Sequence, residues 1–73
     1  MNLLEIIAKA KAEKAKSLDL SQKEIRLLPP ELFEIDSLEE LNLDRNKLVE
    51  IPDEIGKLKN LKSLSVRSYR GSL

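Results

Sequence analysis

Carboxylates are the most plausible catalytic groups in this 73-residue chain, but their spacing does not favour catalysis. Two adjacent pairs occur, Glu39-Glu40 and Asp53-Glu54. Adjacent side chains in a strand or turn point apart, so neither pair is placed to act as general acid and base on one substrate. The chain also has no histidine and no cysteine, which excludes the common nucleophile–base triads. The sequence therefore predicts a protein without enzymatic activity.

Cofactor and metal sites are equally hard to build from these residues. Two glycines, Gly56 and Gly71, cannot form the glycine-rich loop that holds a nucleotide phosphate. Without histidine and cysteine, the usual zinc sites and all disulfides are excluded. Calcium needs several converging oxygen atoms, for which Asp19, Asn42 and Asp44 are the candidates, although solvated surface is the simpler interpretation. We therefore expect no cofactor and no metal.

Thirteen basic and thirteen acidic residues cancel, so the net charge favours neither a nucleic acid nor a membrane as partner. The charges are unevenly distributed, since residues 19–54 contain eleven acids and four bases, and residues 55–73 contain five bases and no acid. This pattern indicates either a solvated surface with a basic tail or attraction between two copies. No segment is apolar enough to span a membrane or to act as a secretory signal, and we expect a cytoplasmic location.

Apolar positions recur every 23 residues along most of the chain. Leu18, Leu41 and Leu64 align at this offset. The other matching columns are Leu20 with Leu43 and Val66, Ile25 with Leu48, Leu28 with Ile51, Pro29 with Pro52, Leu32 with Ile55, Ile35 with Leu58, and Leu38 with Leu61. Agreement at a single period indicates stacked copies of one supersecondary unit.

Each repeat opens with a segment in which apolar and polar residues alternate. In the second repeat, Leu41 and Leu43 are flanked by Glu40, Asn42 and Asp44, as in a strand with one buried face. Since the segments share one phase, we expect parallel strands along one side of a solenoid. The expected strands are centred on residues 18–20, 41–43 and 64–66. The return segments, residues 30–37 and 53–60, have room for about two helical turns, a 3₁₀ helix or an irregular path.

The most regular unit, residues 38–48, reads L-E-E-L-N-L-D-R-N-K-L and matches the leucine-rich-repeat pattern L-x-x-L-x-L-x-x-N-x-L. Ile51-Pro52 and Ile55 after it resemble the 23-residue type of this repeat, as in Ras-binding scaffold proteins and in bacterial and eukaryotic Roco GTPases. The resemblance covers about residues 17–66. It implies an α/β fold, namely a short leucine-rich-repeat solenoid with about three parallel strands.

Residues 1–16 lack the repeat pattern and predict an N-terminal capping helix. They are rich in Ala, Lys and Glu, which favour helices. Asn2 followed by Glu5 matches a capping box with asparagine in the cap position. We expect the helix to cover the first coil, the alternative being a frayed terminal helix. The residues expected to pack on Leu18, Leu20 or the Phe33 region are Leu3, Leu4 and Ile7.

The third repeat begins with the expected leucines and then departs from the pattern. Tyr69 stands in the asparagine column that Asn46 fills in the second repeat, so we interpret Asn46 as a structural residue linking adjacent turns. We treat residues 17–66 as repeats and residues 67–73 as a tail. An uncovered last strand favours a homodimer through this C-terminal edge; the alternative is a tail that folds back over its own core. The candidate edge residues are Leu64, Val66, Arg67 and Tyr69.

Strand phase also predicts a polar concave face, which we take as the candidate surface for a protein partner. Its candidate residues are Asp19, Glu40, Asn42, Asp44, Arg45 and Arg67. No aromatic anchor lies among them, so binding to a foreign protein should be weak. We interpret the chain as a non-catalytic protein-interaction module that self-associates. The alternatives are a regulatory region of a larger signalling protein, such as a Roco-type GTPase, and a truncated product without a dedicated partner.

Overall fold

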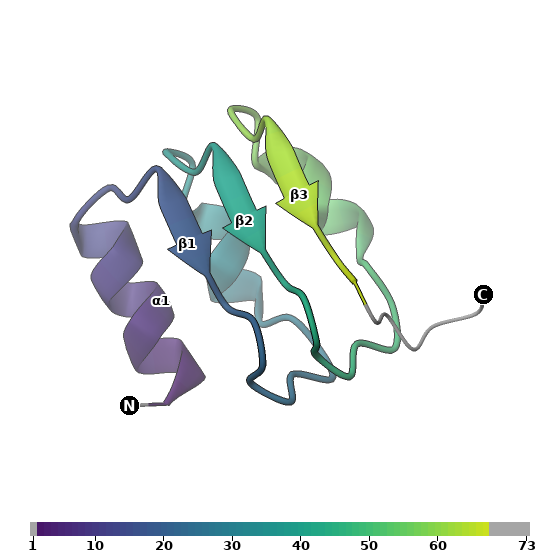
Figure 1. The fold of residues 1–73 in the computed structure, drawn as a ribbon. Helices are drawn as coiled ribbons and strands as arrows, with labels where there is room; N and C mark the ends of the chain where they lie inside the picture. The colour runs from purple at the N-terminus through teal and green to yellow at the C-terminus, as the bar shows by residue number, and fades with distance from the viewer. Residues whose placement is uncertain (1, 68–73) are drawn as a thin grey trace.

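Two stacked coils and the strand of a third follow an N-terminal helix in the computed structural model, which describes residues 2–67 (Figure 1). The elements are α1 (Leu3–Ala12), β1 (Ser17–Asp19), the 3₁₀ helix η1 (Pro30–Glu34), β2 (Glu40–Asn42), the 3₁₀ helix η2 (Asp53–Lys57) and β3 (Ser63–Ser65). Each coil carries one strand, and helix α1 lies beside β1 at the start of the stack (Figure 1). This arrangement is a short α/β solenoid.

The three strands form a parallel sheet in the order β1-β2-β3, as the repeat predicts. Ser17 pairs with Glu40 and Glu40 with Ser63, so the register equals the sequence period. Each strand is centred one residue earlier than predicted. The reason is that pairing starts before the apolar residues, because the backbone N–H of Glu40 already donates to the carbonyl of Lys16 at 2.9 Å.

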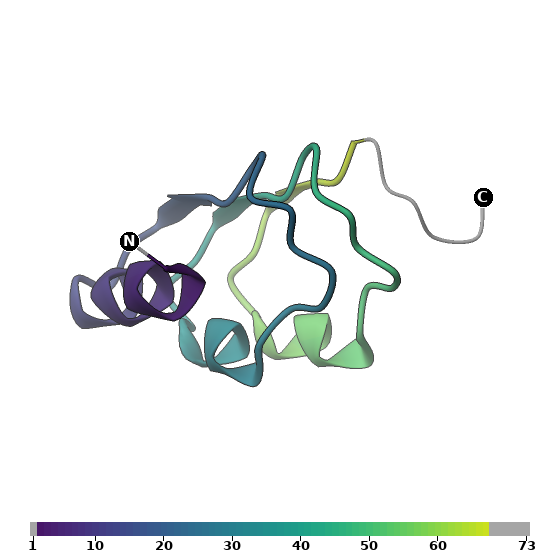
Figure 2. The same ribbon diagram turned by 90° about the horizontal axis from the view of Figure 1, so that it is seen from below.

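The opposite side of the solenoid is formed by η1 and η2, which settles the open choice among the return segments in favour of 3₁₀ helices (Figure 2). Extended prolines precede both helices, Pro29 with φ −72° and Pro52 with φ −71°. Five residues form each helix, and tight i to i+3 hydrogen bonding suits such short segments. The core lies between this layer and the sheet. Its fully buried large side chains are Ile7, Leu20, Leu32, Ile35, Leu38, Leu43 and Leu48.

Helix α1 begins with the predicted capping box. The Asn2 side-chain oxygen accepts from the backbone N–H of Glu5 at 2.9 Å, and the Glu5 carboxylate accepts from the backbone N–H of Asn2 at 3.2 Å. The helix ends at Ala12, earlier than the expected residue 16. Lys14 adopts a left-handed conformation with φ 52°, which turns the chain towards β1.

Three side chains of α1, Leu3, Leu4 and Ile7, are expected from the sequence to pack on the first coil, and one of them does not. Ile7 is 1% exposed and Leu3 is partly buried against the core, but Leu4 is 52% exposed, so that prediction is wrong for Leu4. Helical geometry explains the difference, because Leu3, Ile7 and Ala10 share one face and Leu4 lies about 100° away from Leu3. The helix packs against η1, where Lys11 and Glu34 form an ion pair at 2.7 Å.

Replacing Ile7 with alanine should destabilise the fold by about 2–4 kcal/mol, because it leaves a cavity between the helix and the first coil. The matched change Leu4→Ala removes an exposed side chain and should cost less than about 0.5 kcal/mol. Urea unfolding followed by circular dichroism measures both values. Equal losses in the two variants would show that α1 does not cap the core through the Ile7 face.

Candidate functional site

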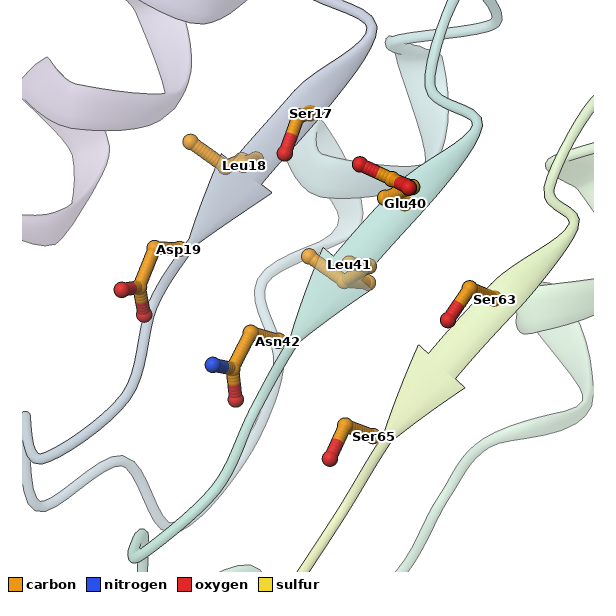
Figure 3. Close-up of a pocket in the computed structure, with 8 residues that line it drawn as sticks. All are labelled: Ser17, Leu18, Asp19, Glu40, Leu41, Asn42, Ser63 and Ser65. Atoms are coloured by element: carbon orange, nitrogen blue, oxygen red, sulfur yellow. The ribbon is translucent and has the colours of Figure 1, made fainter.

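The concave face of the sheet presents two rows of polar side chains across the three strands (Figure 3). Leu18 and Leu41 between the rows are buried, as the alternation of side chains in a strand requires. The first row is Ser17, Glu40 and Ser63, and the second row is Asp19, Asn42 and Ser65. These six residues and the two leucines line a hollow of about 320 Å³. The sheet therefore offers a shallow, polar and hydrogen-bonding surface.

The side chains of the second row also shape the turns that leave the strands. Asp19 accepts from the backbone N–H of Ser21 at 2.9 Å, and Asn42 accepts from the backbone N–H of Asp44 at 2.9 Å. Such contacts two residues ahead are typical of Asp and Asn at turns. Hydrogen bonding from Ser21, first from its hydroxyl and then from its backbone N–H, lowers the pKa of Asp19. Asp19 is thus a stable negative charge on this face.

A second hollow of about 320 Å³ lies where the strands end, and we call it the rim hollow. It is lined by Ser21, Gln22, Asn42, Asp44, Arg45 and Arg67. Asp44 is fixed there, because one carboxylate oxygen accepts from the Ser65 hydroxyl at 2.6 Å and from the backbone N–H of Arg67 at 2.8 Å. These two hydrogen bonds, followed by the charges of Arg67 and Arg45, lower the pKa of Asp44.

All six predicted concave residues line one of the two hollows, and Asn42 lines both. The sequence allows the proximity of Asp44 and Arg67 to be predicted, since the two lie 23 residues apart in one column and carry opposite charges. The sequence does not allow the backbone conformation at Gln22 and Arg45 to be predicted. Both adopt left-handed conformations, with φ 55° and 59°, yet neither is glycine or asparagine.

Asn46 lies below the rim and is 4% exposed. Its side-chain oxygen accepts from the backbone N–H groups of Lys23 at 2.9 Å and Ile25 at 3.1 Å. Its side-chain nitrogen donates to the carbonyls of Leu20 at 2.8 Å and Leu43 at 3.0 Å. One amide therefore satisfies four backbone groups belonging to two neighbouring coils, which is the arrangement a buried polar side chain requires.

The candidate edge residues differ in their surroundings. Leu64 is 40% exposed, and Val66 packs partly against the core. Arg67 lines the rim hollow, whereas Tyr69 and the rest of residues 68–73, which the alternative expects to fold back, lie outside the described residues. Leu58, which shares a repeat column with Ile35, is buried by the coils present.

Neither a metal cluster nor a membrane segment is found in the part of the chain that the structure describes. Among residues 2–67, no three acidic side chains come together in a way that could hold a metal ion, and Asp19 and Asp44 belong to no such group. In the same range, no helix has the length and apolar character needed to cross a bilayer.

The leucine-rich repeat family model matches residues 13–68. This chain belongs to the leucine-rich-repeat family. It is similar to the leucine-rich repeat protein SHOC-2 of Danio rerio, with 42% identity over 57 residues. The match covers 78% of this chain and 10% of that protein, so the leucine-rich-repeat chain spans about a tenth of its relative's length.

Removing the amide of Asn46 should weaken the leucine-rich-repeat stack at its centre. Asn46→Ala leaves buried backbone groups without partners and should lower the free energy of unfolding by about 3 kcal/mol. Asn60 offers a matched control, because it is exposed and its amide donates to one backbone carbonyl, that of Asp36, at 2.8 Å.

Asn60→Ala should cost less than about 1 kcal/mol. Guanidinium unfolding of the wild type and the two variants provides the comparison. A loss for Asn46→Ala no larger than that for Asn60→Ala would contradict a structural role for the Asn46 amide.

Proposed function

We propose that this chain is a non-catalytic protein-interaction module and that its contact surface is the concave face of β1–β3. The observation that carries the proposal is the pair of polar rows, whose six side chains project from three strands held at one register (Figure 3). Within residues 2–67, no other element covers this face of the sheet (Figure 2). A rigid sheet that displays polar groups in columns favours recognition of a complementary partner surface over chemistry.

Acidic and basic side chains occupy different parts of the concave face. Asp19 and Glu40 make the first two strands acidic, whereas Arg45 and Arg67 lie at the strand exits. Electrostatic complementarity of this kind selects partners and their orientation more than it adds affinity. No aromatic side chain lines either hollow, so we expect modest affinity from this segment.

Membership of the leucine-rich-repeat family supports a protein-binding role and leaves its setting open. The 23-residue register supports assignment to the 23-residue type of repeat. We infer a cytoplasmic setting from the absence of cysteine. A regulatory role within a larger signalling protein, such as a Roco-type GTPase, is the second candidate. The coding sequence on either side of this segment distinguishes the two, because a GTPase domain there would favour the regulatory role.

The concave face can be tested by selecting binders from a displayed random peptide library with the 73-residue chain as bait. The double change Asp19→Lys with Glu40→Lys should weaken the selected peptides by about tenfold or more, because it reverses charge at the proposed surface. The control is Glu31→Lys with Glu54→Lys, which makes the same change in net charge on exposed positions of η1 and η2.

Dissociation constants from fluorescence anisotropy compare the three proteins. The dissociation constants of the control variant should lie within about twofold of the wild-type values, because exposed charges far from the contact surface contribute little to binding. If the control weakens binding as much as the concave pair, the concave face is not the contact surface.

We also propose that the chain self-associates through the outer edge of β3. Among residues 2–67, no strand pairs with that edge, and an unpaired edge is a template for pairing with another chain. Leu64 is exposed there, and Ile51, Ile55 and Leu61 are only partly buried. A second copy related by a two-fold axis would pair antiparallel with β3 and cover these side chains.

Light scattering across a concentration series of the 73-residue chain tests this second proposal. The wild type should have the mass of a dimer, and Val66→Lys should give a monomer because it places a charge at the interface. Leu27→Lys is the control, since Leu27 is an exposed apolar residue of the first coil and β2 separates β1 from β3, and this variant should remain dimeric. Circular dichroism reports whether each variant is folded. A wild type that stays monomeric at high micromolar concentration would defeat the proposal.

A further inference from the structure

We propose that the rim hollow binds one carboxylate of the partner protein, an aspartate or glutamate side chain, between the guanidinium groups of Arg45 and Arg67. This inference rests on the proposed function and names the chemistry of its partner at one point of the concave face. The hollow has the volume for a small acidic group, about 320 Å³, and its lining is polar throughout.

The two arginines that line the hollow are available to a ligand. The ion pairs within residues 2–67 are Lys11 with Glu34 and Lys62 with Glu39, so neither guanidinium is paired with a described carboxylate at ion-pair distance. Both arginines line the same hollow as Asp44, and both charges help to lower the pKa of Asp44. Arginine presents a planar array of donors that matches a carboxylate, and two of them can hold one anion from different sides.

Asp44 limits the charge of the ligand that the hollow accepts. One of its oxygens is held by Ser65 and by the backbone of Arg67, so this carboxylate is a fixed part of the site. Two guanidinium groups and one carboxylate leave a net charge of +1 at the rim. A single carboxylate neutralises that charge, whereas a phosphate dianion would exceed it and be repelled by Asp44.

The backbone at the rim is held in a conformation that L-residues rarely adopt. Gln22 and Arg45 are both left-handed, and each is fixed by a hydrogen bond to the next coil, Gln22 N–H to the Asp44 carbonyl at 3.0 Å and Arg45 N–H to the Arg67 carbonyl at 2.9 Å. Glycine would suit these positions better on steric grounds. Side chains that occupy strained positions often serve a ligand site, and both of these line the hollow.

Charge complementarity supports a protein carboxylate as the occupant. The rest of the concave strip is acidic, through Asp19 and Glu40, so an acidic partner group is attracted to the rim and repelled elsewhere. A partner segment would therefore lie with its acidic residue at the rim hollow and its basic residues over β1 and β2, where Asp19 and Glu40 lie. Placement of one residue fixes the direction of the whole segment.

The test uses the isotope-labelled 73-residue chain and three blocked tripeptides in a nuclear magnetic resonance titration. The tripeptides are Gly-Glu-Gly, Gly-Gln-Gly and the phosphoserine equivalent. The glutamate peptide should shift the amide signals of Ser21, Gln22, Arg45 and Arg67 in a saturable way, with the glutamine peptide about fivefold weaker or more. No saturable shift with the glutamate peptide, or equal binding of the glutamine peptide, would overturn the carboxylate site.

Variants assign the effect to the two arginines. Arg45→Gln and Arg67→Gln should each weaken the glutamate peptide by about fivefold or more, and Arg45→Lys should fall between them and the wild type because it keeps charge but loses the planar donors. Arg26→Gln, an exposed arginine outside the hollow, is the control and should bind as the wild type does. The amide spectrum of each variant reports that it remains folded.

The remaining outcomes separate this inference from the function on which it rests. Tighter binding of the phosphoserine peptide than of the glutamate peptide would overturn the choice of a carboxylate. Library peptides that need Asp19 and Glu40 but bind Arg45→Gln and Arg67→Gln unchanged would support the interaction module and overturn the rim site. Library peptides that depend on both arginines and carry an acidic residue would support both.

Discussion

A constant offset of 23 residues between neighbouring coils is the constraint on which the structure depends. It sets the sheet register, in which Ser17, Glu40 and Ser63 lie side by side. A nearly equal offset appears on the far side of the solenoid, where Asn60 donates to the carbonyl of Asp36. Because side chains in a strand alternate between faces, a slip of one residue would exchange the core with the concave surface. The packing of the core and the polar concave face therefore both depend on the 23-residue offset.

Burial in this fold depends on having neighbours on both sides. The aligned leucines show this directly, since Leu18 is 9% exposed, Leu41 is 2% exposed and Leu64 is 40% exposed. Leu41 lies between the neighbouring strands β1 and β3, and Leu18 lies beside α1, with which it lines one hollow. A solenoid thus gains core mainly through contacts between units, and each uncovered side loses part of the apolar stabilisation.

Sequence periodicity predicts the parallel sheet, the polar face and the capping box, because each depends on residue type at regular spacing. It places the strands one residue late, since backbone pairing begins at Glu40 before the first apolar side chain of β2. It also assigns Leu4 to the core, because the apolar run at the start of α1 does not show which face turns inward. The left-handed backbone at Arg45 has no residue signature at all, being imposed by hydrogen bonding between coils.

The amide of Asn46 also has a consequence for the order in which the protein forms. Lys23 occupies the equivalent column of the first coil and cannot supply the same contacts, so the backbone N–H groups of Lys23 and Ile25 rely on Asn46. On a ribosome that adds about 5–20 residues per second, Asn46 is made about 1–5 s after Lys23. The first turn must wait through that interval, so the nascent chain completes its first coil with a residue synthesised one full repeat later.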